Sequence, residues 1–245
     1  MAVFGNVMMV FNRNTAPLIP LIPLNNFISY WKFDGNSNDS VGSNNGTPTS
    51  ITYPSGLIGQ AADFNGTTSN VVVPDANDLS FGNGTSDVDF STITLIKFDD
   101  LSDNPRLFTK IRADAFQFEY IALPVNGKFN FINYDTDNNK QIRTENDVVI
   151  PLSEWIVITQ TYEASTKTLK TYQNTAINNV NLNQGAYTSM INTNAPLVIG
   201  KDGRSAFANN LDGQINALSF LNVKLSEGQV AYAVNKYLTD NQHLI

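Results

Sequence analysis

The chain has 245 residues, of which 42% are hydrophobic and 11% aromatic, enough apolar material for one packed domain. Its net charge is −7 and its basic residues are scattered, which argues against binding to nucleic acid. The absence of cysteine excludes disulfides, zinc–thiolate sites and thiol nucleophiles. The single histidine, His243, excludes a multi-histidine metal site, and its place near the chain end predicts poor order rather than a role as general base.

The chain begins with an apolar segment punctuated by prolines, MAVFGNVMMVFNRNTAPLIPLIPLNN. Its first apolar run, Met1–Phe11, is well short of the roughly 18–20 residues that a membrane-spanning helix needs. No basic residue precedes Arg13, although a secretion signal begins with a basic region. We therefore expect residues 1–26 to be a retained and ordered arm.

The prolines of this arm recur at every third position, which is the period of a polyproline II helix. Leucines follow with the same spacing, so the extended rod is apolar on all sides and should be buried between protein surfaces. The alternative is that it folds back on its own domain. The residues expected to make the contacts are Phe4, Met8, Met9, Phe11, Pro17, Leu18, Pro20, Leu21, Pro23 and Leu24.

From Phe27 onward, short runs rich in Val, Ile, Phe, Tyr and Thr alternate with Gly, Asn, Asp and Ser, the pattern of an all-β domain. Asn126-Gly127 lies between two alternating runs and predicts a tight hairpin. The predicted strands are Phe27–Phe33, Ala61–Phe64, Val71–Val73, Phe90–Phe98, Arg106–Ile111, Phe116–Leu123, Lys128–Tyr134, Gln141–Thr144, Trp155–Tyr162, Leu169–Gln173, Leu197–Gly200 and Gly213–Asn222.

One helix is predicted near the end of the chain. Ser226 and Gln229 form a capping box, and Val230, Val234 and Leu238 follow on one helical face. About a dozen short strands with one late helix indicate a β-sandwich or jelly roll over residues 27–245, with no second domain.

Several motifs in series resemble those of the laminin G-like, concanavalin A-like jelly rolls. They are Ser29–Gly35, Asn38–Gly42, Gly56–Gly66, Val71–Pro74, Phe90–Lys97, Ser153–Tyr162, Leu169–Asn174, Leu197–Gly200, Leu211–Ile215 and Leu225–Ser226. The resemblance implies an all-β jelly-roll sandwich, here with an extended N-terminal arm and one short C-terminal helix. Two departures stand out. Leu95 replaces a frequent tryptophan of the core or concave face, and Asn216 and Ala217 replace two acids, which weakens any calcium site there.

Glucanases of this fold carry Glu-x-Asp-x-x-Glu on one strand. The nearest match here is Glu145-Asn-Asp147, and Ile150 stands where the second glutamate would be. Because retaining glycosidases need two carboxyl groups about 5–5.5 Å apart, we expect a surface segment and no enzyme.

Two kinds of binding site are consistent with the loops. Asp34, Asp39 and Asp212 are candidate calcium ligands, although such residues commonly shape turns, which is the interpretation we favour. We keep the hypothesis of a structural calcium ion near Asp34, and we expect no other cofactor. Tyr53, Tyr187, Asp202, Arg204, Phe207 and Asn209 are candidate glycan-binding residues, and the alternative is that the aromatic ones anchor loops or contact other subunits.

The leading hypothesis is a non-enzymatic virion protein of a bacteriophage, assembled in the host cytoplasm as a capsid decoration, head fibre or tail appendage. The arm would bind sister subunits and other virion proteins, while the domain could contact host glycans. The alternative is a secreted or cell-surface carbohydrate-binding module. A glycan-cleaving enzyme is disfavoured by the missing glutamate.

Overall fold

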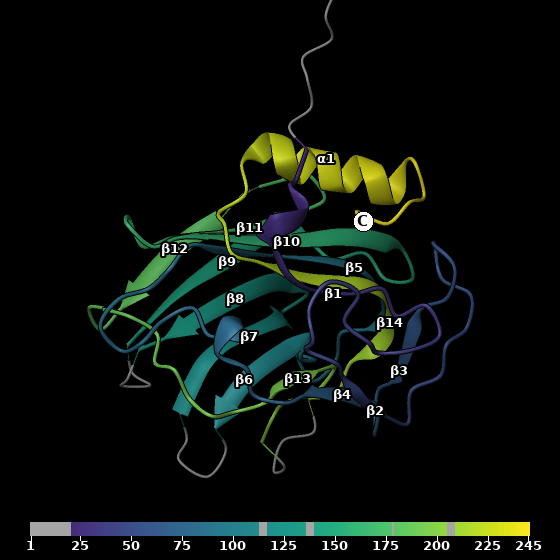
Figure 1. Cartoon of the computed structure of the whole chain (residues 1–245), viewed down its shortest axis with the longest axis horizontal. Coiled ribbons are helices and arrows are strands. Elements are labelled where there is room, and N and C mark those ends of the chain that lie inside the picture. Colours follow the sequence, from purple (N-terminus) through teal and green to yellow (C-terminus); the bar gives the residue numbers. More distant parts are fainter. Residues whose placement is uncertain (1–20, 113–116, 136–139, 178, 205–208) are drawn as a thin grey trace, which may run out of the picture.

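A computed structural model describes residues 21–112, 117–135, 140–177, 179–204 and 209–245 of the chain. Over these residues the strands form two antiparallel sheets packed face to face (Figure 1). The six-stranded sheet contains β1 (Phe27–Trp31), β3 (Ala62–Asn65), β5 (Phe90–Asp100), β10 (Trp155–Glu163), β11 (Thr168–Gln173) and β14 (Asp212–Leu221). The eight-stranded sheet contains β2 (Thr47–Thr49), β4 (Asn70–Val73), β6 (Phe108–Arg112), β7 (Gln117–Val125), β8 (Lys128–Tyr134), β9 (Gln141–Val149), β12 (Asn179–Gln184) and β13 (Leu197–Ile199).

The order of the strands confirms the predicted jelly-roll sandwich. In the six-stranded sheet it is β1-β14-β5-β10-β11, with β3 also paired to β14, and in the eight-stranded sheet it is β12-β9-β8-β7-β6-β13-β4-β2. The predicted hairpin joins β7 to β8, because Asn126 (φ +52°) and Gly127 (φ +72°) both take the left-handed conformation of a type I′ turn. Two strands were not predicted. β2 is short, exposed and contains Pro48, and β12 is rich in asparagine.

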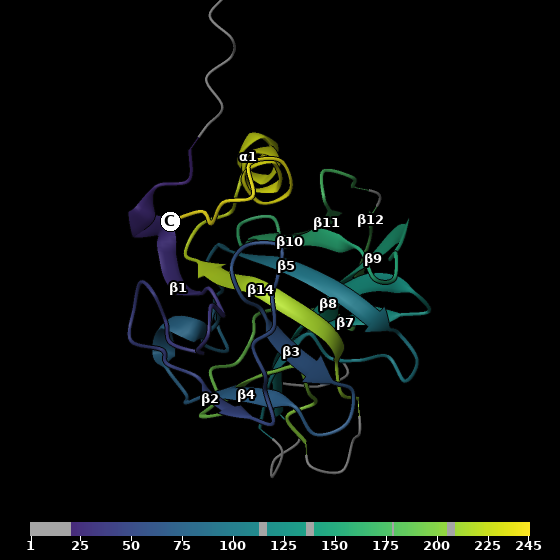
Figure 2. The same cartoon turned by 90° about the vertical axis from the view of Figure 1, so that its right-hand side faces the viewer.

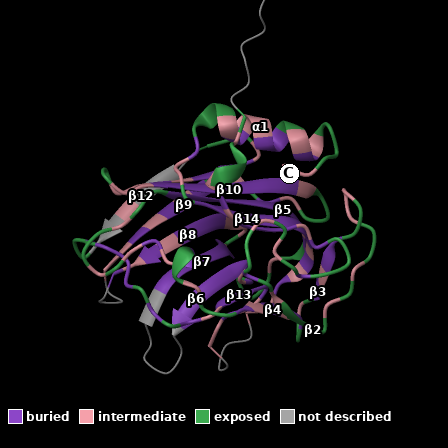
Figure 3. Ribbon diagram, viewed as in Figure 1, coloured by how far each residue is buried: buried purple, intermediate pink, exposed green. Residues whose placement is uncertain are grey.

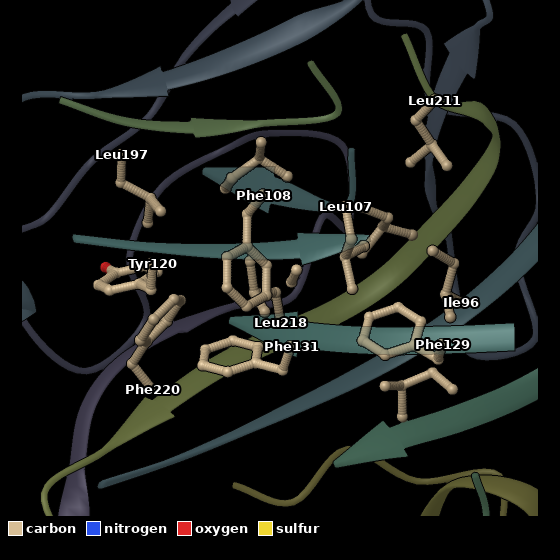
Figure 4. Packing of buried hydrophobic residues seen from close by; sticks show 14 of the residues in the cluster. Ile96, Leu107, Phe108, Tyr120, Phe129, Phe131, Leu197, Leu211, Leu218 and Phe220 are labelled. Atoms are coloured by element: carbon tan, nitrogen blue, oxygen red, sulfur yellow. The ribbon is translucent and has the colours of Figure 1, made fainter. Parts of the chain in front are cut away.

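Aromatic side chains fill the space between the sheets. Phe108, Phe131 and Phe220 come from different strands and meet there (Figure 4). The ring centroid of Phe108 lies 6.0 Å from that of Phe131 and 5.2 Å from that of Phe220. Phe81 stacks on Phe90 with a centroid separation of 4.2 Å. Burial follows the strands, while the connecting loops are largely exposed (Figure 3). The inter-sheet core is thus built by every second residue of the central strands.

Helix α1 (Glu227–Leu238) covers the outer face of the six-stranded sheet (Figure 2). The predicted capping box is present: the Gln229 backbone N–H donates to Ser226 Oγ at 3.3 Å, and the Ser226 N–H donates to Gln229 Oε1 at 3.0 Å. Leu95 is fully buried beneath this helix, in the cluster that contains Val234 and Tyr237. The substitution at position 95 therefore affects the contact between helix and sheet, and not the core between the sheets.

The chain end is packed, so the expectation of a poorly ordered His243 was wrong. The Tyr30 hydroxyl lies 3.0 Å from His243 Nδ1 and 3.0 Å from the Tyr237 hydroxyl, and it accepts the Leu244 N–H at 3.2 Å. Burial, followed by the positive charge of Lys32, lowers the pKa of His243. The two tyrosines, both buried, give the tail a polar docking point that composition alone does not indicate.

A buried ion pair lies at a bulge between β6 and β7, where the strand register skips Glu119. Lys110 Nζ donates to Glu119 Oε1 at 2.9 Å and to Asp75 Oδ1 at 2.8 Å. The side chains of Lys110 and Glu119 have no exposed surface, and the Thr193 N–H also donates to Glu119 Oε1 at 2.7 Å. Removing the ammonium group would therefore leave a carboxylate buried without its cation.

The end of the predicted arm leaves the domain beside helix α1. Leu21 and Leu24 are 67% and 61% exposed, and Pro23 is extended with φ −61° and ψ 140°. The Leu21 carbonyl accepts a hydrogen bond from Gln229 Nε2 at 3.3 Å, which fixes this point to the helix. The remaining arm residues, Phe4, Met8, Met9, Phe11, Pro17, Leu18 and Pro20, lie outside the described residues. In the part of the chain that is described, no helix has the length and apolar character needed to cross a bilayer.

Candidate functional site

The outer face of the eight-stranded sheet is built by the residues that alternate with the core. Phe108, Tyr120 and Phe131 point into the core, so their neighbours in sequence point outward. Strand pairing aligns these outward positions in one row across six strands. The row runs Val72, Val198, Thr109, Ile121, Ile132 and Arg143.

A small apolar cluster forms the floor of this face. Ile111, Ile121 and Leu123 are only 3–6% exposed, and Ile132 and Tyr134 pack against them. The cluster is separate from the core between the sheets, because the two groups of side chains stand on opposite sides of the same strands. An apolar floor on an outward sheet face is available to support groups that bind a ligand.

Asp202 holds two arginines beside this floor. The carboxylate is fully buried and accepts Arg204 Nε at 2.9 Å, Arg204 Nη2 at 2.8 Å and Arg106 Nε at 3.3 Å. Burial alone would raise the pKa of Asp202, but the hydrogen bonds and charge of Arg204 together with the charge of Arg106 lower it. The loop that carries Asp202 is fixed over the sheet because the Gly203 N–H donates to Thr109 Oγ1 at 3.0 Å.

Tyr134 completes the cluster from strand β8. Burial raises the pKa of its hydroxyl, while the positive charges of Arg106, Arg204 and Arg143 act in the opposite direction. The net shift is upward, so the phenol stays protonated next to three guanidinium groups. The cluster therefore combines hydrogen-bond donors with an aromatic ring, groups that commonly line ligand-binding sites.

Two hollows open on the same face. One of about 210 Å³ is lined by Val125, Asn126, Lys128, Asn130, Glu145 and Asp147. The other, of about 170 Å³, is lined by Asn70, Val72, Val198, Lys201, Asp202 and Gly203. The outward positions between them belong to the apolar floor and the arginine cluster, so the two hollows and these residues form one continuous surface.

The acidic motif at Glu145 and Asp147 lies on this surface in strand β9. Arg143 Nη2 contacts Glu145 Oε1 at 2.8 Å, and Lys128 Nζ contacts Asp147 Oδ1 at 3.0 Å. Ile150, at the position of the second glutamate, is 3% exposed and belongs to the core. Each of these two carboxylates thus has a cationic partner and is partly exposed, which fits the surface segment expected from the sequence.

The structure gathers some of the predicted glycan-binding residues and separates others. Asp202 and Arg204 lie together, and the carbonyl of Asn209 accepts the Arg106 N–H at 3.1 Å beside them. Tyr53 lies elsewhere, with its hydroxyl 2.8 Å from Ser37 Oγ. Phe207 lies outside the described residues.

Tyr187 requires a correction. It is only 3% exposed, and its hydroxyl donates to Asp87 Oδ2 at 2.7 Å, alongside the Tyr162 hydroxyl at 2.6 Å. Its ring therefore anchors a loop, the alternative interpretation of the loop aromatics, and is not an exposed platform for a sugar.

The three candidate calcium ligands lie apart. Asp39 shapes a turn by accepting the N–H groups of Tyr30 at 2.9 Å and Asn44 at 3.1 Å, while Asp34 accepts the Gln60 N–H at 2.9 Å. Burial, followed by Asp99, Asp100 and Asp63, raises the pKa of Asp212. Within the described ranges no three acidic or histidine side chains gather as a metal site. The structural ion near Asp34 stays a prediction.

Asn216, which replaces an acid of the family pattern, has a structural role. Its amide nitrogen donates to the carbonyls of Ile58 and Gln60, both at 2.8 Å, and its oxygen accepts the Ile58 N–H at 2.7 Å. Two of these bonds need an N–H donor, which aspartate lacks. Asn216 thus clamps the loop before β3.

Sequence reasoning missed Tyr134, Arg106 and Arg143. The signal was available in part, since the predicted strands at 128–134 and 141–144 place Tyr134 and Arg143 at alternating, outward positions. Their association with Arg106 depends on strand order.

Comparison with known proteins agrees with this fold. The family model described as the concanavalin A-like lectin/glucanases superfamily matches residues 65–231, and the chain belongs to this family. No curated protein matches the chain.

Several solved structures are similar in fold. Domain 4 of AbnA, an extracellular GH43 arabinanase from Geobacillus stearothermophilus in complex with arabinotriose, matches with a TM-score of 0.64 and 19% identity, over 85% of this chain and 98% of that one. The binding domain of Paraclostridial Mosquitocidal Protein 1 matches with a TM-score of 0.69 and 17% identity, over 88% of this chain and 53% of that one. The binding domain of botulinum neurotoxin DC, in complex with rat synaptotagmin II, matches with a TM-score of 0.66 and 10% identity, over 89% of this chain and 53% of that one. This chain therefore spans about half the length of the two toxin binding domains.

Proposed function

We propose that this chain is a non-enzymatic recognition domain that binds a glycan on the outer face of the eight-stranded sheet. The observation that carries the proposal is the cluster in which buried Asp202 fixes Arg106 and Arg204 beside Tyr134 and an apolar floor. Fixed guanidinium groups suit the oxygens of a sugar, and the Tyr134 ring suits its apolar faces, while the buried floor of Ile111, Ile121 and Leu123 supports this ring. Support also comes from the similar structures, which include an arabinotriose complex and two binding domains.

The acidic groups of this face do not suit glycoside hydrolysis. A general acid needs a raised pKa, whereas the pKa of Asp202 is lowered. Glu145 is half-exposed, and its carboxylate contacts Arg143 Nη2 at 2.8 Å. We therefore assign the carboxylates of this face to positioning cationic side chains.

A glycan array with the full chain tests the proposal. Arg204→Ala should abolish the array signal, while Lys170→Ala should retain it, because Lys170 is a surface cation in strand β11 of the other sheet. Circular dichroism establishes that both variants are folded. A folded Arg204→Ala variant that retains all signals would show that the ligand binds elsewhere or that the face is not a binding site.

We further propose that residues 1–26 attach the domain to a larger particle, namely a bacteriophage virion, where the domain is displayed as a decoration, head fibre or tail appendage. Support comes from the proline period of the arm and from the exposure of Leu21 and Leu24 where it meets the domain. Burial of such apolar side chains by sister subunits or other virion proteins would be favourable.

Deletion of residues 1–24 tests this attachment. The truncated domain should fold and bind its glycan but fail to join its native particle in a sedimentation assay. Incorporation of the truncated domain would overturn the docking role of the arm. Tight, calcium-dependent glycan binding by a monomer would instead favour the rival, a secreted or cell-surface module.

A further inference from the structure

A third hollow opens where the edge strand β1 meets the segment that precedes β5. Its volume is about 390 Å³, larger than either hollow of the outer face, and it shares no residue with them. Strand β1, the turn η2 (Asn77–Leu79) and the loop after it all contribute to its walls. The lining residues include Ile28, Asp78, Ser80, Phe81, Val88 and Asp89.

The apolar part of this hollow is open to solvent. Val88 is 57% exposed, and Ile28, which stands at a bulge where the pairing of β1 with β14 shifts, is half-buried. Phe81 also lines the hollow, and its ring is held in place because it stacks on Phe90. An exposed valine beside a fixed phenylalanine is a patch that is stabilised when another apolar group covers it.

Two carboxylates of the same hollow have no cationic partner among the described side chains. Asp78 accepts hydrogen bonds from Asn44 Nδ2 at 3.2 and 3.3 Å, and Asp89 accepts the Ala164 N–H at 2.8 Å. The ion pairs formed by described residues include neither of them. Ser80 adds a hydroxyl oxygen that is buried and has no hydrogen-bond partner within the described ranges. The polar part of the hollow therefore suits a cation with several N–H donors, and a guanidinium group is such a cation.

The N-terminal arm carries one group of this kind. Arg13 is the only charged side chain that precedes Lys32 in the sequence. The segment around it, residues 10–18, reads VFNRNTAPL, so the cation has apolar residues on both sides. The hollow has the complementary composition, because its two carboxylates stand among apolar side chains.

The course of the arm favours docking on a second copy of the chain. Residues 21–26 run from β1 toward α1, where Gln229 Nε2 binds the Leu21 carbonyl (Figure 2). The proline at every third position from Pro17 to Pro23 predicts a stiff, extended backbone that does not turn back on its own domain. Arg13 precedes Leu21 by eight residues, which span about 25 Å in a polyproline II helix. This reach is sufficient for a neighbouring copy.

We infer that the arm of one copy of this chain docks in the hollow of a second copy. In this arrangement Arg13 lies beside Asp78 and Asp89, and its apolar neighbours cover Val88. The inference rests on the proposed role of the arm in attachment. It is narrower, because it identifies the surface that receives the arm and makes a sister subunit the partner.

Single-cysteine variants of the full chain test this contact, since the chain has no cysteine of its own. Asn14→Cys marks the arm next to Arg13, and Val88→Cys marks the hollow. Val149→Cys is the matched control, because Val149 is 68% exposed on strand β9 of the other sheet. When two variants are mixed under mild oxidation, Asn14→Cys should form a disulfide-linked dimer with Val88→Cys in at least fivefold higher yield than with Val149→Cys. Equal yields, or no linked dimer, would overturn the inference.

A variant with both Asn14→Cys and Val88→Cys identifies which copy owns the hollow. Docking on a second copy should give linked dimers whose yield falls when the protein is diluted before oxidation. A monomer with an internal disulfide at every concentration would show that the arm docks on its own domain, and this result would overturn the inference.

Substitutions of Arg13 test the charge without altering the hollow, so they remain informative even where a variant of the hollow fails to fold. Arg13→Gln should lower the yield of linked dimer at least fivefold, whereas Arg13→Lys should retain most of it. Replacing Asp78 and Asp89 together with asparagine should have the effect of Arg13→Gln, because asparagine keeps an acceptor oxygen but removes the negative charge. An unchanged yield for Arg13→Gln would overturn the inference.

Failure of this inference can be distinguished from failure of the attachment itself. If the arm does not link to Val88→Cys, but deletion of residues 1–24 still prevents the domain from joining its particle, the arm binds another component and only the inference fails. If the truncated domain joins its particle, the attachment role fails whatever the cross-linking shows.

Discussion

Replacing Asn216 with aspartate should destabilise the domain, although the change restores the acid of the family pattern. Asn216 has no exposed surface and makes three hydrogen bonds of 2.7–2.8 Å to the backbone of Ile58 and Gln60. Aspartate keeps the acceptor but loses both donors, so it leaves two carbonyl oxygens unpaired and places a charge against them. At about 1–3 kcal/mol for each buried group left unpaired, the unfolding free energy should fall by about 2–6 kcal/mol.

Urea unfolding followed by circular dichroism measures this change. The midpoint should fall while the slope stays constant, and Asn194→Asp, at an exposed position, should leave the midpoint nearly unchanged. Both variants are compared with and without 1 mM calcium chloride. An Asn216→Asp protein that is as stable as wild type, or that calcium makes more stable than wild type, would refute the loop-clamp role and revive a calcium site there.

Three further predictions concern stability. The unfolded chain binds a proton at His243 from about pH 6.5 downward, whereas burial keeps the folded pKa lower, so the stability due to the docked tail should fall as the pH drops below 6.5. Thermal unfolding between pH 7.5 and 5 should show a flatter profile for His243→Gln, and parallel profiles would contradict this. Gly200→Ala should lower the free energy of unfolding, measured in urea, by about 2–5 kcal/mol, because φ is +81° and the new Cβ would lie 2.2 Å from the Phe64 ring. An unchanged midpoint would contradict this and would mean that the ring moves aside. Lys110→Met should lower the free energy of unfolding by about 3–5 kcal/mol, because it leaves the buried Glu119 carboxylate without its cation. Adding Glu119→Leu should restore most of this stability. A double variant no more stable than the single one would count against the ion pair.

The parts of the fold that depend on neighbours in sequence were predictable. Strand β8 has the bounds read from the alternation of Lys128–Tyr134, and the β7–β8 hairpin follows from the preference of Asn126 and Gly127 for positive φ. The capping box at Ser226 is equally local. Each feature is decided within a few residues, so one sequence suffices.

The candidate site was only partly predictable, because it depends on contacts between distant segments. Asp202 and Arg204 were proposed as loop residues, but their partner Arg106 is about a hundred positions away in the chain. Its place in a loop makes Tyr187 a candidate platform, yet its ring is buried and its hydroxyl donates to Asp87, also a hundred positions away. Neither outcome follows from local propensity; both follow from the order and register of the strands.

Alternation along the strands gives the two faces of each sheet different side chains. In β8, Phe129 and Phe131 pack between the sheets while Asn130 and Ile132 face outward, so adjacent residues serve different surfaces. Substitutions on the outward face can therefore change the ligand without creating a cavity in the core. The fold itself tolerates extensive sequence change, since TM-scores of 0.64–0.69 persist at identities of 10–19% in the similar structures. On the function proposed above, the ligand contacts side chains of the outward face and of the loop beside it, namely the arginines around Asp202 and Tyr134.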